Sequence, residues 1–336
     1  MSTKTKTKSK KKTALKTIVI IVAVIAALAI FLNVAGTHRS KPEQVKSFDT
    51  ANPYILAETD ISGHRSGGGI APEETLMAFK NCAENPAFSI DVFEFDLHIT
   101  SDDVLVLLHD DTLDRTSDCE EVFGEKDVRP ETKTFEELKT LNMGAKFENE
   151  QGEMPYASLK GDEVPDELRI LSLDEVLDYL TSAGDYKYII EIKNGEDLGR
   201  KGVDILYKML TERNLLDQVI FGTFKGEISE YVDENYPDLT RSTGITEALE
   251  FWWAALTNSK SYEPPCKVLQ LPYGAPFSYL GINMGTAQMI NYAHEHDMAI
   301  QYWTVNEEDD MEYLISVGAD CIMTDYPDVL YNVKNK

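Results

Sequence analysis

The stretch Phe93–Glu94–Phe95–Asp96–Leu97–His98 alternates apolar and polar side chains with a period of two. Successive side chains of a β-strand point to opposite faces, so Glu94 and Asp96 share one face and the three apolar residues share the other. In a strand of a barrel, the face opposite the aromatic rings points inward. Two inward carboxylates need a compensating charge, because an isolated buried charge is strongly unfavourable.

A divalent cation would supply that charge. Carboxylate oxygens are the ligands that Mg²⁺ and Ca²⁺ prefer in proteins, so Glu94 and Asp96 are candidate metal ligands. The alternative is an ordinary salt bridge at the rim of the barrel.

Short apolar runs of this kind recur along the chain and alternate with amphipathic helical patterns. The expected strands begin near Ile61, Val92, Tyr186, Gln218, Leu239, Lys267, Met298 and Asp320. The expected helices include Glu74–Ala83, Gly202–Arg213, Glu247–Asn258, Thr286–His294 and Met311–Val317. Eight strands with intervening helices predict an α/β fold of the TIM (β/α)8 barrel type. A doubly wound open sheet is the alternative, but no nucleotide-binding glycine fingerprint follows the first strand.

One region breaks this rhythm. Val104–His109 is expected to form an additional strand that returns beside the second strand through the polar turn Ser101–Asp102–Asp103. Residues 111–169 then run polar and mostly aperiodic, which is too long for an ordinary connection. We interpret them as a small insertion after the second-strand hairpin.

The amino-terminal part of the chain has the pattern of a membrane anchor. Residues 1–16 hold seven Lys and no acidic residue, and residues 17–37 hold no charge. As a helix, that apolar run would span about 30 Å, the hydrocarbon thickness of a bilayer. The positive-inside rule then predicts a single-pass protein of the cell membrane with a cytoplasmic tail at 1–16, an anchor at 17–37 and a stalk at 38–57. A cleaved signal peptide is the alternative.

The folded domain would occupy residues 58–336 and lie outside the cytoplasm. Its composition is acidic: the whole chain carries a net charge of −26, although the first sixteen residues are basic. Nucleic acid is excluded as an expected partner, because binding to phosphate backbones needs a basic surface. The four cysteines show no CxxC spacing, which disfavours a zinc site.

Residues that can perform chemistry gather at the ends of the expected strands. His64 and Arg65 follow the first strand and precede a glycine-rich loop, where an Arg and free backbone N–H groups suit a phosphate. His109 follows the additional strand and could act as an acid or base near neutral pH. Glu191 and Lys193 share one face of the strand near Tyr186. Since the carboxyl ends of barrel strands form the active sites of this fold, the set predicts phosphoryl chemistry.

Taken in order, these motifs closely resemble the glycerophosphodiester phosphodiesterase family. The resemblance runs from about residue 60 to 330 and rests on seven motifs. They are His64–Arg65–Ser66, Pro72–Glu73–Glu74–Thr75, Glu94–Phe95–Asp96, His109–Asp110, Glu191–Ile192–Lys193, Trp303–Thr304–Val305–Asn306 and Thr324–Asp325–Tyr326–Pro327. Two residues depart from the family pattern: Ser66 replaces a Gly, and Glu74 replaces an Asn.

The resemblance implies a TIM barrel that hydrolyses glycerophosphodiesters to glycerol 3-phosphate and an alcohol. It implies roles for eight residues: Glu94, Asp96 and Glu191 hold one Ca²⁺ or Mg²⁺, His64 and His109 form the acid–base pair, Arg65 and Lys193 contact the phosphate, and Trp303 lines the substrate cleft. Three alternatives remain open. The same chemistry could act on lysophospholipids or on the polyglycerol-phosphate of a cell wall, or the barrel could be a non-catalytic surface module that binds glycerol phosphates.

Overall fold

The computed structural model describes residues 15–31, 50–274 and 283–336. Its sheet has the strand order β5-β4-β2-β1-β8-β7-β6, and every neighbouring pair in this order is parallel. The strands are β1 Asp60–Gly63, β2 Val92–Ile99, β4 Lys187–Ile192, β5 Val219–Gly222, β6 Val268–Pro272, β7 Ala299–Trp303 and β8 Cys321–Thr324. Each begins within one residue of its predicted start, because each apolar run is bounded by polar or turn-forming residues.

The sheet closes into a barrel between β5 and β6. Arg241 forms a parallel bridge with Phe221 of β5, and Ser242 forms one with Val268 of β6. The strand predicted from Leu239 is therefore present as two single bridges instead of a full ladder. Its polar residues offer little apolar surface to bury against neighbouring strands, which accounts for its shortness. The α/β barrel of parallel strands is confirmed.

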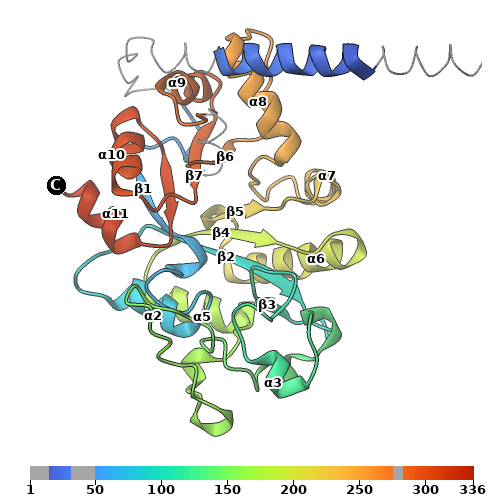
Figure 1. Ribbon diagram of the computed structural model, residues 1–336, viewed down its shortest axis with the longest axis vertical. Coiled ribbons are helices and arrows are strands. Elements are labelled where there is room, and N and C mark those ends of the chain that lie inside the picture. Colours follow the sequence, from blue (N-terminus) through green and yellow to red (C-terminus); the bar gives the residue numbers. More distant parts are fainter. Residues whose placement is uncertain (1–14, 32–49, 275–282) are drawn as a thin grey trace, which may run out of the picture.

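Helices surround the sheet, with α8, α9 and α10 towards one end of the molecule and α2 and α5 towards the other (Figure 1). The predicted helices are present, with ends shifted by at most three residues, except that the helix predicted at Gly202–Arg213 begins six residues earlier, at Glu196. Further helices follow β3, β5 and β8. Their bounds are α2 Leu76–Glu84, α5 Leu173–Ala183, α6 Glu196–Arg213, α7 Gly226–Asn235, α8 Ile245–Thr257, α9 Ala287–Glu295, α10 Glu308–Val317 and α11 Pro327–Lys334.

The apolar and acidic side chains of β2 lie on opposite faces of the strand, as their alternation in the sequence predicts. Phe93, Phe95 and Leu97 are fully buried in the large apolar cluster between the sheet and the helices. Val92, on the opposite face, packs in a second cluster inside the barrel with residues of β4, β5, β6, β7 and β8. Glu94 and Asp96 are on this inner face and are almost completely buried.

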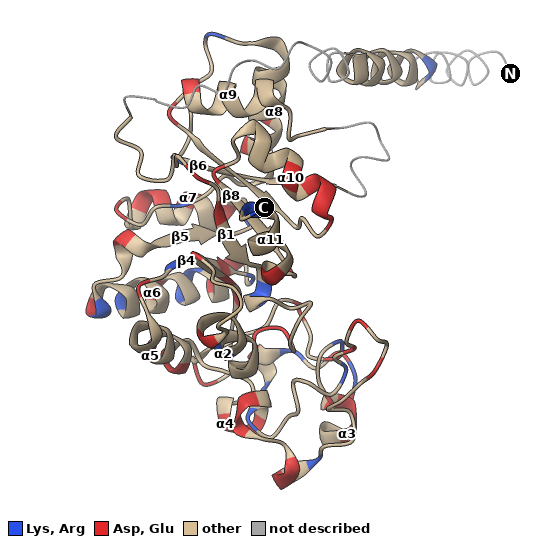
Figure 2. Ribbon diagram, turned by 90° about the vertical axis from the view of Figure 1, so that its left-hand side faces the viewer, with Lys and Arg blue, Asp and Glu red and all other residues tan. Residues whose placement is uncertain are grey.

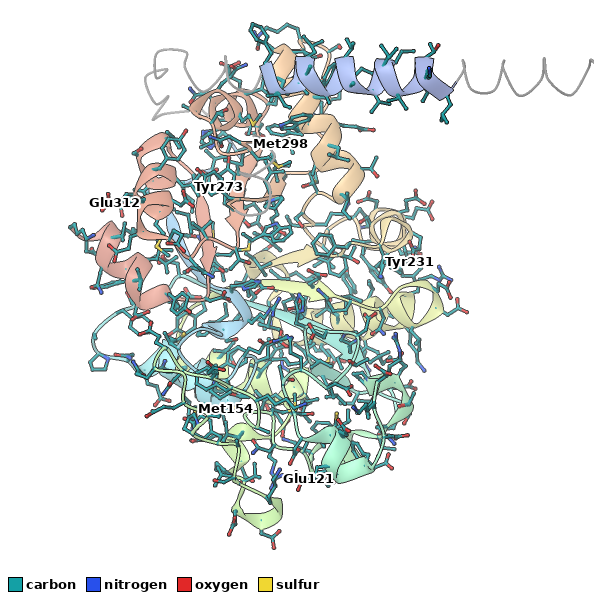
Figure 3. All side chains as sticks on the ribbon, viewed as in Figure 1. Glu121, Met154, Tyr231, Tyr273, Met298 and Glu312 are labelled. Atoms are coloured by element: carbon teal, nitrogen blue, oxygen red, sulfur yellow. The ribbon has the colours of Figure 1, made fainter. Side chains whose placement is uncertain are left out.

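The predicted insertion has a small hydrophobic core of its own. β3, Leu105–Leu107, pairs antiparallel with β2, as expected for Val104–His109. Side chains of β3 and the following loops pack together with α3 (Cys119–Phe123) and α4 (Phe135–Leu138). Glu121 and Met154, both in the insertion, lie at the end of the molecule opposite Met298 (Figure 3). The insertion thus extends the barrel on one side.

Acidic side chains are spread over the described part of the chain, including α4, α7 and α10 (Figure 2). The first turns of these helices contain Glu136 and Glu137, Glu227, and Glu308 to Asp310, respectively. Negative charge near a helix amino terminus interacts favourably with the helix dipole. Part of the acidity therefore contributes to helix stability.

The amino-terminal region is described at residues 15–31, which form a helix with exposed apolar side chains such as Ile18 and Phe31. Within the described residues, no helix combines the length and apolarity needed to cross a bilayer. The rest of the predicted tail, anchor and stalk, at 1–14 and 32–49, lies outside them. Residues 50–57 pack on the barrel: the Asn52 amide donates to the carbonyls of Lys267 and Asp297, and Tyr54 is buried in the interior cluster.

Candidate active site

All eight predicted site residues lie at or near the carboxyl ends of the barrel strands. His64 and Arg65 directly follow β1, Glu94 and Asp96 belong to β2, and His109 follows β3. Glu191 lies on β4 with Lys193 just beyond it, and Trp303 ends β7. The parallel strands bring most of these segments together at one end of the barrel, and the antiparallel β3 returns the chain beside Asp96, where Leu108 N–H donates to the Asp96 carbonyl next to His109. The sequence prediction of a shared site is consistent with this placement.

Lys193 contacts two carboxylates, and a third, Glu94, lies on the same face of β2 as the first of them. Asp96 and Glu191 are direct partners across the β2–β4 ladder, and Lys193 Nζ lies 3.3 Å from Asp96 Oδ1 and 2.9 Å from Glu191 Oε1. Burial, reinforced by the charge of Asp96, raises the pKa of Glu94 to about 7 and that of Glu191 to about 8. Burial also raises the pKa of Asp96, but Lys193 and other nearby cations hold it below its ordinary value. The cluster therefore carries repulsion that one lysine offsets only in part.

The residues of this cluster fit a divalent cation by their chemistry. Asp96 Oδ2 is buried and has no hydrogen-bond partner among the described residues. An unpartnered buried acceptor is costly, and a cation would satisfy it. As they stand, however, the described His, Cys, Asp and Glu side chains do not form a group of three or more that is ready to hold a metal ion. Lys193 currently bridges two of the three carboxylates.

Two histidines each form a pair with an aspartate. His64 Nδ1 lies 2.7 Å from Asp325 Oδ1, and its Nε2 lies 3.4 Å from Thr304 Oγ1. Asn306 donates to the second oxygen of Asp325. Burial lowers the pKa of His64, but the charges of Glu94 and Asp325 outweigh it and raise the pKa above the ordinary value. The sequence motifs contained Asp325 and Asn306 but assigned them no role.

His109 Nδ1 lies 2.7 Å from Asp110 Oδ1. Here burial dominates and lowers the pKa of the imidazole. Asp110 is held in place by Arg115, whose Nε donates to Asp110 Oδ2 at 2.6 Å. Hydrogen bonds from Arg115 and His109 outweigh burial and lower the pKa of Asp110 to about 2. The two histidines thus differ in the direction in which the protein shifts their pKa.

Arg115 links His109 to the loop after β1. Its guanidinium also forms two hydrogen bonds with Glu73, at 2.8 and 2.7 Å. No motif or periodicity in the sequence points to this residue, because it lies in the polar insertion and its partner Glu73 is distant in the chain. Arg115 is a positioning residue: it fixes the carboxylate that orients His109.

Replacing Arg115 with alanine is expected to lower kcat about 10- to 100-fold, the usual effect of losing a residue that orients an active-site ligand. Because a nearby cation is removed, the pKa of His109 should rise, and the acidic limb of the pH–rate profile should move to higher pH. Steady-state kinetics across pH would measure both effects. Arg129→Ala is the matched control, since Arg129 is an insertion residue whose ion-pair partners, among the residues that the structure describes, are Asp111 and Glu131. Equal profiles for the two variants would rule out the positioning role.

Three residues in the segment after β1 adopt a left-handed backbone conformation that glycine reaches most easily. Arg65, Ser66 and Glu74 all adopt positive φ angles, of 48°, 63° and 55°. This conformation directs the Arg65 backbone N–H to Glu94 Oε2 at 2.7 Å. Arg65 Nε is a buried donor without a partner in the described part of the protein. An unsatisfied guanidinium N–H is suited to an anionic oxygen.

The two departures from the family pattern are both buried. Ser66 is fully enclosed, and its Oγ has no hydrogen-bond partner in the described structure. Glu74 Oε1 accepts a hydrogen bond from the Asp96 backbone N–H at 2.7 Å. An amide oxygen could accept the same bond, so Glu74 preserves this contact to the strand. Burial and the charge of Asp96 raise the pKa of Glu74 well above its ordinary value, which favours its neutral form.

Two cavities of different character border the site. One, of about 250 Å³, contacts Glu191 and Trp303 and is lined mainly by apolar side chains of the β5–α7 loop, α8 and β6. The other, of about 380 Å³, contacts His64 and Arg65 and is lined by polar groups, among them residues 148–150 of the insertion. Trp303 and Thr304, adjacent in the chain, belong one to each cavity.

Histidine–aspartate pairs, an Arg65 Nε–H that has no partner among the described residues, and buried carboxylates at the mouth of a parallel barrel form a set of groups suited to the hydrolysis of phosphate esters. Comparison with known proteins identifies the family. The model of the glycerophosphoryl diester phosphodiesterase family matches residues 64–329. The chain therefore belongs to this family and is a phosphoric diester hydrolase.

Individual relatives support this assignment. The chain is 29% identical over 279 residues to a glycerophosphodiester phosphodiesterase of Caldanaerobacter subterraneus, covering 83% of this chain and 99% of the relative. It is 28% identical to a glycerophosphodiester phosphodiesterase of Bacillus subtilis, over 81% of this chain and 85% of the relative. A solved Oleispira antarctica phosphodiesterase in complex with its product sn-glycerol-3-phosphate shares the fold, with a TM-score of 0.62, 20% identity, and coverage of 83% of this chain and 98% of that one.

Proposed function

We propose that this enzyme uses one divalent cation, Ca²⁺ or Mg²⁺, to hydrolyse glycerophosphodiesters to glycerol 3-phosphate and an alcohol. The observation that carries the proposal is the buried carboxylate cluster, whose Asp96 Oδ2 has no partner among the residues described, in the same site as two histidine–aspartate pairs. The names of the relatives and the product bound to the Oleispira enzyme support the substrate class.

Glu94, Asp96 and Glu191 would hold the cation. When bound, it would stabilise negative charge on the phosphate oxygens and reduce the repulsion among the three carboxylates. Arg65 Nε and Lys193 Nζ would contact the phosphate from the protein side. Because both cations are largely buried, their interaction with the phosphate is stronger than it would be in water.

The surroundings of the two histidines shift their pKa values in opposite directions, and this suggests different catalytic roles. A pair of titratable groups with pKa values shifted apart is the usual arrangement for an acid and a base. We assign the acid to His64, whose pKa is raised, and the base to His109, whose pKa is lowered. The aspartates hold Nδ1 of each ring, so the Nε2 atoms exchange protons with the reactants. A cation on Glu94 would offset that carboxylate's influence on His64, while Asp325 would continue to favour the protonated ring.

The anchor also remains a proposal. Its support is the exposed apolar side chains of the helix at residues 15–31 and the uncharged sequence that continues to residue 37. The preceding Lys-rich residues would lie in the cytoplasm, which places the barrel outside it in a single-pass membrane protein.

A hydrolysis assay tests the proposed reaction. The purified protein should release glycerol 3-phosphate from glycerophosphocholine, glycerophosphoethanolamine and glycerophosphoglycerol in the presence of Ca²⁺ or Mg²⁺, and a chelator should stop the release. Glu94→Ala should be inactive with either cation, because it removes one proposed ligand and the partner of the Arg65 N–H. Absence of glycerol 3-phosphate from every substrate, or release unaffected by chelation, would contradict the proposal.

A further inference from the structure

The polar cavity at the active site has two walls. His64, Arg65 and Thr304 line it on the barrel side, and residues 148–150 line it on the insertion side. His64 is the proposed acid, and Arg65 is one of the proposed phosphate contacts. The oxygen that His64 protonates belongs to the alcohol that leaves, so this alcohol lies beside His64 during the reaction. The leaving alcohol would therefore occupy the cavity and meet the insertion wall.

The insertion wall is a compact turn built around Asn149. The side-chain oxygen of Asn149 accepts hydrogen bonds from the backbone N–H groups of Gln151 and Glu153, at 3.1 and 2.8 Å. The backbone N–H of Asn149 donates to the Glu153 carbonyl at 2.9 Å. Asn side chains stabilise turns by such bonds to the following backbone. The turn holds Glu148 and Glu150, on either side of Asn149, at the edge of the cavity.

The charges around the cavity are balanced on the barrel side but not on the insertion side. Glu73 is paired with Arg115, and Asp325 is paired with His64. Arg65 is left for the negative charge of the phosphate. The two carboxylates of the turn are exposed and have no ion-pair partner among the described residues. Two uncompensated negative charges therefore border the place of the leaving alcohol.

An aromatic ring borders the same cavity. Tyr326 packs on the backbone of Gly69, where a Cβ atom would lie only 2.6 Å from Tyr326 Cε1. Burial raises the pKa of the Tyr326 hydroxyl, and the charges of Asp325 and Glu150 add to this effect. Ammonium groups are attracted both by carboxylates and by aromatic rings. The insertion wall and Tyr326 together suit an organic cation.

We propose that Glu148 and Glu150 are specificity-determining residues, which favour a diester whose leaving alcohol carries an ammonium group over one whose alcohol is neutral. The phosphate lies at Arg65, and the positive charge of the alcohol lies between the turn and Tyr326. This inference rests on the proposed phosphodiesterase function and on the role of His64 as the acid. It specifies the alcohol, which the carboxylate cluster and the histidines do not select.

The ammonium group keeps its charge throughout the reaction. Water attacks phosphorus and gives a proton to His109, while the bond between phosphorus and the alcohol oxygen breaks and His64 gives its proton to that oxygen. The products are glycerol 3-phosphate and the free amino alcohol. Because the ammonium group contacts the turn equally in the substrate and in the transition state, this contact should lower KM and leave kcat nearly unchanged.

The test compares glycerophosphocholine with its neutral isostere, the 3,3-dimethylbutyl ester of glycerol 3-phosphate, in which carbon replaces the nitrogen. The wild type should have a kcat/KM about three- to tenfold higher on the choline ester, the effect of one or two partly exposed ion pairs. Salt at about 1 M should remove most of this preference, because the Debye length falls to about 3 Å. The double variant Glu148→Gln/Glu150→Gln should abolish the preference by raising KM for the choline ester, and should change kcat/KM on the isostere less than about twofold.

Asp162→Asn/Glu163→Gln is the matched control, because both residues are exposed carboxylates of the insertion and border neither of the two cavities. It removes the same amount of charge and should leave the preference in place. Equal kcat/KM values of the wild type on the two esters would overturn the inference, and so would a turn variant that lowers both values equally. An equal loss that additional Ca²⁺ restores would assign the turn to a metal ion instead. No turnover of any glycerophosphodiester would contradict the underlying phosphodiesterase function.

Discussion

Asp96→Asn is expected to lower kcat/KM about 10²- to 10³-fold, the range seen when a preorganised electrostatic contact to the transition state is removed. Asp96 is the central carboxylate of the cluster: it neighbours Glu191 across the strands, contacts Lys193, and has an Oδ2 that finds no hydrogen-bond partner in the described part of the chain. Asparagine keeps the shape and the main-chain contact to Glu74 but lacks the negative charge. Adding more Ca²⁺ or Mg²⁺ should restore only part of the activity.

The stability of the metal-free protein gives an independent readout of the same residue. Glu94 and Glu191 have pKa values of about 7 and about 8 when folded, against 4.5 ordinarily. Between pH 4.5 and about 8 the folded state therefore binds more protons than the unfolded state, so its free energy of unfolding falls as pH rises. Thermal unfolding in chelator should show this decline, and Asp96→Asn should flatten it because the repelling charge is gone.

Cation binding should oppose that decline. Ca²⁺ or Mg²⁺ should raise the melting temperature of the wild type more at pH 8 than at pH 5, since the ligands must be deprotonated to bind it. Asp96→Asn should lose most of this increase. A wild type whose melting temperature is indifferent to both cations at pH 8 would argue against the metal site, whatever the activity assays gave.

Replacing either active-site histidine should also reduce kcat strongly. Replacing His64 or His109 with asparagine is expected to lower kcat about 10²- to 10⁴-fold, the contribution of a positioned general acid or base. Asparagine can still donate to the aspartate partner, so Asp325 and Asp110 should remain in place. Affinity for glycerol 3-phosphate, measured by titration calorimetry, should change little.

The pH dependence identifies which histidine is which. Wild-type kcat/KM should be bell-shaped around the ordinary histidine pKa of 6.5. Rate should fall below that pH as His109 becomes protonated, and above it as His64 loses its proton. The residual activity of His109→Asn should lack the acidic limb, and that of His64→Asn the alkaline limb. The opposite pattern would exchange the two roles, and a wild type that binds glycerol phosphates without any turnover would favour the non-catalytic binding module.

The predictability of the fold from sequence can be seen at β2. Its alternating pattern placed Glu94 and Asp96 on the inner face and Phe93 and Phe95 on the outer face, and the structure agrees. Strand starts were predicted within one residue for the same reason, since side-chain direction and apolar periodicity are local properties of the backbone. The strand expected from Leu239 is present only as two single bridges among the described residues. Its length depends on how much of its surface the neighbouring strands cover, and the local sequence pattern does not contain this information.

The insertion shows more clearly what sequence periodicity cannot predict. Residues 111–169 looked polar and aperiodic, yet Leu113, Cys119, Val128 and Leu138 are buried in a common core. Short helices and loops place apolar residues inside without a repeating interval, so no periodicity reveals them. The contact of Arg115 with Glu73 and Asp110 is likewise invisible in the sequence, because it depends on how the insertion folds back on the barrel.

The sequence by itself determined the parallel barrel, the residue types of its active end and the inward face of the carboxylates, because these follow from local periodicity and strand direction. Only the tertiary structure decided how these residues act on one another. Burial and neighbouring charges move the pKa values of His64 and His109 in opposite directions. The apolar wall on one side of the site and the polar wall on the other are assembled from segments far apart in the chain, since a cavity exists only where separate elements meet.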